Sequence, residues 1–248
     1  MPLANADLRR VMLRTHLLQA TWNYERQQGV GWAWSLQPVI ERLYPEGEER
    51  TERLLEHTAY FNTQPTLASV ALGAAAALEE QRANGGQVDA DVMARVKGVL
   101  GSALAAIGDR LFWFTLRPFA ACVGLIFATR GSWAGALLLW ACYNSLHLVM
   151  RARGVEWGYR SGPSVLSEGL RATLERLINR LSVMGSMLVG ILTAVLLVPR
   201  GEPREVTFQV MLIAGLALGL LSASRARPTP SQWALGLGAL AVASAWLR

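Results

Sequence analysis

Apolar and polar side chains follow a helical pattern in the first part of the chain. Over residues 7–45 apolar residues recur at helical spacing, with Arg9, Arg10 and Arg14 on the opposite side. Residues 48–60 repeat this pattern with glutamates on the polar side. We therefore expect two amphipathic helical segments, the first of which can lie flat at a membrane surface.

Aromatic residues are concentrated in the first of these segments, as Trp22, Tyr24, Trp32, Trp34 and Tyr44. Tryptophan and tyrosine are enriched at the headgroup level of membranes, because one edge of the ring is apolar and the other is polar. The same residues also pack in protein cores. The sequence leaves both interpretations open.

Long apolar stretches dominate the second part of the chain. Residues 131–150, 181–199, 206–224 and 228–247 contain no Asp, Glu, Lys or Arg. About 20 apolar residues suffice for a helix to cross a bilayer. We therefore expect an all-α integral membrane protein, in which N-terminal amphipathic and re-entrant helices precede several transmembrane helices. Residues 1–115 form the amphipathic and re-entrant region, and residues 116–248 the transmembrane region.

The segments between these two patterns are shorter. Residues 66–78 are a run of small apolar residues, too short to span a membrane, which predicts a buried helix or a re-entrant segment. Residues 91–116 are rich in glycine and alanine. Pro118 follows, and because proline has no N–H we expect a helix break there, as in the discontinuous helices of transporters.

Composition and charge exclude several classes of protein. Hydrophobic residues make up 52% of the 248 residues and charged residues 17%, which is unlike an ordinary cytosolic enzyme or a disordered chain. The net charge of +6 comes from arginines that mostly flank apolar stretches, where they meet lipid phosphates rather than nucleic acid. Residues 151–180 carry six arginines and three acids, which predicts a cytoplasmic segment. The N-terminus lacks a signal-peptide pattern and is also expected in the cytoplasm.

Catalytic motifs are not recognisable in the sequence. The two cysteines and three histidines have no metal-ligand spacing, and no nucleophile elbow or phosphate-binding loop occurs. Glu79 and Glu80 are adjacent, and adjacent helical residues do not face each other. We therefore expect no catalytic residue, no metal and no cofactor on this chain.

Two polar groups in apolar surroundings are candidates for ligand binding. The first is Asn62, Thr63 and Gln64, whose uncharged donors and acceptors suit sugar hydroxyls, although they could equally cap a turn. The second is Asp109, which either binds a ligand or pairs with a nearby arginine. Trp113 follows it, and could stack on a sugar face or anchor the interface.

Three segments in the same order carry a family resemblance. They are W-N-Y-E-R at residues 22–26, F-N-T-Q-P at residues 61–65, and G-S-A-L-A-A-I-G-D-R-L-F-W-F-T-L-R-P at residues 101–118. This pattern resembles the enzyme IID component of the mannose/fructose/sorbose-type phosphotransferase system. The resemblance covers essentially the whole chain.

The resemblance implies a transport function. Enzyme IID pairs with the membrane subunit IIC in the inner membrane to form a channel for a hexose-type sugar, and several such pairs associate. Cytoplasmic IIA and IIB relay phosphate to the sugar, and IID itself carries no phosphorylated residue. The substrate-binding candidates on this basis are Asn62, Thr63, Gln64, Asp109 and Trp113. The alternative is a regulatory or structural membrane protein, derived from IID, that has no sugar flux.

Some positions depart from the family pattern. Gln64 stands where the family has histidine, and Arg110 stands where it has serine. Ala106 and Phe114 replace glycines. We expect Arg110 to add a charge beside Asp109. The small-residue surfaces at residues 66–78 and 98–108 are expected to pack against IIC, because small residues let helices approach closely.

Overall fold

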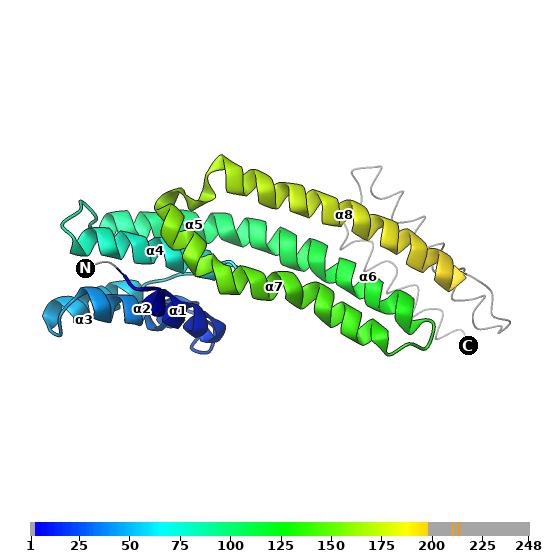
Figure 1. Cartoon of the computed structure of the whole chain (residues 1–248), viewed down its shortest axis with the longest axis horizontal. Coiled ribbons are helices and arrows are strands. Elements are labelled where there is room, and N and C mark those ends of the chain that lie inside the picture. Colours follow the sequence, from blue (N-terminus) through cyan, green and yellow to red (C-terminus); the bar gives the residue numbers. More distant parts are fainter. Residues whose placement is uncertain (1–2, 198–209, 211–212, 214–248) are drawn as a thin grey trace, which may run out of the picture. The chain divides into compact units, whose positions relative to one another are not determined.

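Helices form every regular element in the part of the chain that the computed structural model describes, residues 3–197 with positions 210 and 213 (Figure 1). Residues 1–192 pack as one unit. The expected transmembrane stretches at residues 206–224 and 228–247 lie outside the described residues, apart from two isolated positions.

Helices α1 (Asn5–Arg14), α2 (Gly29–Leu43) and α3 (Glu48–His57) form the N-terminal layer, and a 3₁₀ turn, η1 (Thr15–Leu17), follows α1. The amphipathic pattern of α1 serves the protein core, since Leu8 and Val11 are buried. The aromatic residues divide between the two interpretations. Trp32 and Tyr44 are in the core, whereas Trp22, Tyr24 and Trp34 are exposed.

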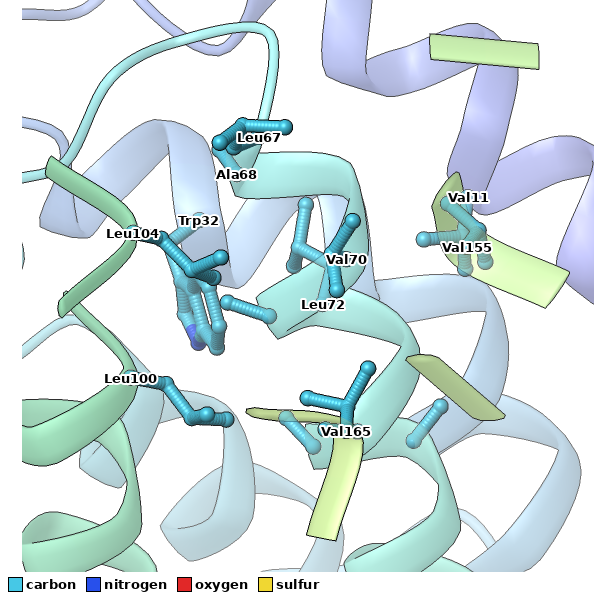
Figure 2. Close-up of a cluster of buried hydrophobic side chains, with 14 of the residues drawn as sticks. Val11, Trp32, Leu67, Ala68, Val70, Leu72, Leu100, Leu104, Val155 and Val165 are labelled. Carbon is cyan, nitrogen blue, oxygen red and sulfur yellow. The ribbon is translucent and has the colours of Figure 1, made fainter. Parts of the chain in front are cut away.

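Helix α4 (Ala68–Ala83) is the centre of the core, and every residue from 68 to 79 is buried. Figure 2 shows Val70 and Leu72 of α4 among side chains of α2, α5 and α7, including Trp32, Leu100 and Val155. Residues 66–78 therefore contribute to a buried helix. The expectation that this surface packs against a partner subunit is wrong, because the surface is already covered within the chain.

The contact between α4 and α7 (Ala134–Ser161) is unusually close because glycines line it. A Cβ atom at Gly73 would collide with the carbonyl oxygen of Val155, and one at Gly158 with the carbonyl oxygen of Val70. Gly154 lies against the hydroxyl of Ser69 in the same way. The small residues therefore bring two helix backbones of the same chain together, as small residues do between membrane helices.

Helix α5 (Ala90–Gly108), the π-helical segment η2 (Asp109–Leu116) and α6 (Arg117–Ala128) form one continuous helix. Among the described residues, it is the one helix long and apolar enough to cross a membrane. The expected break before Pro118 does not occur. Because proline lacks an N–H and its ring crowds the preceding turn, the chain widens into η2 there instead of breaking.

The remaining described helices pack along this continuous helix. Helix α6 lies antiparallel to α7, where a Cβ at Gly135 would collide with the carbonyl oxygen of Gly124 (Figure 1). A 3₁₀ turn, η3 (Gly162–Leu166), connects α7 to α8 (Glu168–Leu197). An ion pair of 2.8 Å between Arg110 and Glu175 fastens α8 to η2.

The close packing of α4 on α7 predicts a strong effect of one added methyl group. Gly158→Ala should destabilise the protein by about 1–3 kcal/mol or more, because main-chain atoms of α4 occupy the space of the new Cβ. Gly98→Ala on α5 is the matched control, since nothing lies within 4 Å of its added Cβ. Thermal melting of the purified protein measures both. Equal melting temperatures for the two variants would contradict this packing.

Candidate functional site

The F-N-T-Q-P loop connects α3 to α4, and two of its candidate residues are buried in hydrogen bonds. Thr63 is 4% exposed and its hydroxyl donates to the carbonyl oxygen of Gly101, at 2.9 Å. Gln64 is 5% exposed and its Oε1 accepts the N–H groups of Thr66 and Leu67, at 2.8 and 3.0 Å. Thr63 therefore ties the loop to α5, and Gln64 holds the turn that precedes α4.

Asn62 differs from its neighbours because it is exposed, at the edge of an open cleft of about 1000 Å³. One wall of the cleft is formed by Glu25, Arg26 and residues of the chain from Leu55 to Asn62, and the other is one face of α5. The α5 face carries small side chains, namely Ala94, Gly98, Gly101, Ser102 and Ala105. The amide of Asn62 is thus accessible beside a wall that offers space.

Asp109 and Trp113 lie further along the same continuous helix and do not line the cleft. Both are exposed. Asp109 follows Ala105 by four residues, about one helical turn, and Trp113 follows by about one more. The structure therefore places Asp109 and Trp113 along the continuous helix, beyond the cleft that Asn62 of the loop lines, and not in one pocket with Asn62.

The expected ion pair of Asp109 is not formed within the described part of the chain. Arg110 instead binds Glu175 of α8, and the guanidinium of Arg117 lies 5.2 Å from the ring centre of Trp113. The reason is geometric, because adjacent helical residues point in different directions. Arg110 therefore does not neutralise Asp109.

A buried polar network beneath the cleft was missed by the sequence analysis. The indole N–H of Trp32 donates to Nδ1 of His57 at 3.2 Å, and Nε2 of His57 lies 3.0 Å from Oε1 of Glu79. The hydroxyl of Tyr44 donates to the other oxygen of Glu79, at 2.7 Å. Because an indole nitrogen only donates, Nδ1 of His57 must accept, and its ring proton lies on Nε2.

The charge state of this network follows from burial and hydrogen bonding. Burial lowers the pKa of His57, which keeps the imidazole neutral. Burial alone would raise the pKa of Glu79, but hydrogen bonds from His57 and Tyr44 and the nearby Arg82 outweigh it and lower that pKa. Glu79 is therefore an ionised carboxylate at the centre of the fold. The network is saturated and has a structural role.

Lys97 joins this network to the cleft. It is the only lysine of the chain, it is buried, and it lines the cleft. Its ammonium group lies 3.3 Å from the carbonyl oxygen of His57 and 5.4 Å from the centre of the Trp32 ring. Among the described residues, no group of three or more His, Cys, Asp or Glu side chains could hold a metal ion.

A sequence signal for the network exists in retrospect. His57 lies four residues before the F-N-T-Q-P loop, and Glu79 ends an apolar run. A buried run that ends in a carboxylate indicates a partner elsewhere in the chain, because buried charges are paired or hydrogen-bonded. The identity of that partner depends on tertiary structure.

Several known proteins that are similar in sequence to this chain are IID components. The chain is 40% identical to the mannose-specific EIID component of the phosphotransferase system from Escherichia coli K12 over 191 residues, which are 77% of this chain and 68% of that protein. It is 35% identical to the sorbose-specific EIID component from Klebsiella pneumoniae over 190 residues, which are 77% of this chain and 69% of that protein. It is 31% identical to the fructose permease IID component from Bacillus subtilis 168, with 77% of this chain and 70% of that protein covered.

Solved structures show the same fold. A chain from a structure of a membrane protein matches with a TM-score of 0.76 and 29% identity, covering 100% of this chain and 98% of that chain. A chain from the cryo-EM structure of the mannose transporter ManYZ in complex with microcin E492 matches with a TM-score of 0.63 and 30% identity, covering 99% and 97%.

A family model agrees with these relatives. Residues 2–208 match the model of the IID component of the mannose/fructose/sorbose family of the phosphotransferase system. The match includes all the candidate residues, from Asn62 to Trp113. The chain therefore belongs to the IID component family of the mannose/fructose/sorbose phosphotransferase system.

Proposed function

We propose that this chain is the IID subunit of a sugar permease, which forms with a IIC subunit the channel for sugar uptake coupled to phosphorylation by IIA and IIB. The family supports this proposal, since relatives are named for mannose, sorbose and fructose. The long apolar helix from Ala90 to Ala128 supports placement in a membrane. The substrate is a hexose-type sugar.

The proposed location is the bacterial inner membrane, with several spans and a cytoplasmic N-terminus. The arginine-rich residues 151–180 support this orientation, because basic loops stay on the cytoplasmic side. IIA and IIB are soluble partners on that side. IIC and IID associate in pairs, and the pairs in a higher oligomer.

One observation carries the proposed site. In the F-N-T-Q-P loop the residues on either side of Asn62 are buried, whereas Asn62 itself is accessible at a cleft. An amide both donates and accepts hydrogen bonds without carrying charge, which suits sugar hydroxyls. Further along the proposed sugar path, outside the cleft, Asp109 offers an acceptor for hydroxyls and Trp113 an aromatic face for the apolar side of a sugar. Thr63 and Gln64 hold the loop that presents Asn62.

The first test concerns Asn62. Asn62→Ala should raise the KM of sugar uptake about tenfold, because one hydrogen bond to the sugar is lost. Association with IIC should be unchanged, since the side chain is exposed and the loop is held by its neighbours. Uptake of radiolabelled mannose, fructose and sorbose measures the first effect and co-purification the second. Asn5→Ala, at an exposed position of α1, is the control. An unchanged KM in Asn62→Ala would remove the loop from the sugar path.

The second test concerns Asp109. Asp109→Asn should reduce uptake and leave the complex assembled, because no ion pair of Asp109 is formed within the described residues and no charge is left unpaired. Glu46→Gln removes the same charge on an exposed turn and should change neither property. The assays are those used for Asn62. Loss of co-purification with IIC would place Asp109 in the subunit interface and contradict its role as a sugar ligand.

A further inference from the structure

The main chain of the F-N-T-Q-P loop is bound by one buried side chain, that of Gln28. Its Nε2 donates to the carbonyl oxygen of Thr63 at 2.8 Å, and its Oε1 accepts the N–H of the same residue at 3.1 Å. Gln28 is 1% exposed. Both halves of the amide thus pair with one residue of the loop, as two strands would pair.

The main chain around Gln28 also binds Phe61, the loop residue two positions before Thr63. The N–H of Gln28 donates to the carbonyl oxygen of Phe61 at 2.8 Å, and the N–H of Phe61 donates to the carbonyl oxygen of Arg26 at 3.3 Å. Asn62 therefore lies between two residues that are both bound to the chain before α2. The chain before α2 therefore holds Asn62 through the residues on either side of it.

The backbone conformation of Gln27, the residue before Gln28, indicates that the surrounding structure forces the chain into this arrangement. Gln27 has a φ of 52°, in the left-handed region that non-glycine residues seldom adopt. Such a conformation persists only where the surrounding structure over-determines it, and it is common at functional sites. Here it turns the chain so that the following side chain enters the loop.

Helix α5 holds the loop from the other side. The hydroxyl of Thr63 donates to the carbonyl oxygen of Gly101, and a Cβ at Gly101 would lie 3.3 Å from the carbonyl oxygen of Asn62. The main chain of Asn62 is thus enclosed between α5 and the start of α2. Its side chain is the part of the loop that remains free to meet a ligand.

We propose that Gln28 is a positioning residue for sugar recognition, whose buried amide holds the loop main chain so that Asn62 points into the cleft. An apolar residue would fill the same space, so packing alone does not require an amide. The pairing of one donor and one acceptor with the same residue sets the rotation of the loop, and hence the direction of the adjacent side chain. This inference rests on the proposed role of Asn62.

A double-mutant cycle in the assembled permease tests the proposal. Gln28→Met keeps the length of the side chain and removes both hydrogen bonds. We expect the KM of uptake to rise about tenfold, because the two hydrogen bonds that hold the loop and orient Asn62 are lost. The maximal rate per assembled complex should be retained. The variant that combines Gln28→Met with Asn62→Ala should be no worse than Asn62→Ala alone. Gln19→Met, on an exposed position, is the matched control.

The outcomes separate the inference from the proposed function. An additive loss in the double variant, or a normal KM in Gln28→Met while Asn62→Ala is impaired, overturns the positioning role alone. A normal KM in Asn62→Ala overturns the proposed site, and the role of Gln28 with it. If Gln28→Met does not assemble, Gln28→Glu decides, since it keeps the length of the side chain and an acceptor for the N–H of Thr63 and loses the N–H that donates to the carbonyl oxygen of Thr63. It should also raise the KM and be non-additive with Asn62→Ala, and additivity there would overturn the proposal.

Discussion

The close contact between α4 and α7 is the constraint on which the other described features depend. Glycines at positions 73 and 158 let the two backbones touch, and residues 68–79 of α4 are buried. Because α4 is fixed, the loop before it and the carboxylate of Glu79 near its end are fixed as well. One face of α4 meets α7, and the others meet α2 and α5, which form or support the walls of the cleft.

The buried polar groups support the fold, whereas the exposed Asn62 is the group proposed to bind the ligand. The network of Trp32, His57, Glu79 and Tyr44 satisfies a buried charge and joins α2, α3 and α4. Such a network contributes uniqueness more than net stability, because desolvation offsets much of its attraction. The loop that carries the exposed amide of Asn62 is joined to this network through Phe61, whose ring centre lies 4.0 Å from that of Trp32. A ligand would therefore meet a side chain whose surroundings are already ordered, which lowers the entropic cost of binding.

Local patterns predicted the helices well and their contacts poorly. Helical spacing predicted the N-terminal helices but missed their interruption, because the segment expected over residues 7–45 is two helices, α1 and α2, separated by η1 and a non-helical stretch. For the small-residue run at positions 66–78 the sequence allows a buried helix or a re-entrant segment, and the structure shows it buried in α4 and the turn before it. The expectation that this run packs against IIC was wrong, because the spacing of small residues indicates that a surface is buried but does not indicate which element covers it. The same limit explains Asp109, whose expected arginine binds Glu175 instead, and His57, whose partners come from two other helices. The helix break expected at Pro118 was wrong, because the helix continues through the π-helical segment η2 directly before the proline.

Thiol labelling tests most directly whether Asn62 is the residue of the F-N-T-Q-P loop that faces the ligand. Cysteine is placed singly at position 62 or 63 in a chain whose own Cys122 and Cys142 are replaced by serine and which still assembles. The account predicts that a small maleimide labels position 62, that a transported sugar slows this labelling, and that position 63 is inert because it is buried. Equal labelling of position 62 with and without every sugar tested, or rapid labelling of position 63, would contradict it.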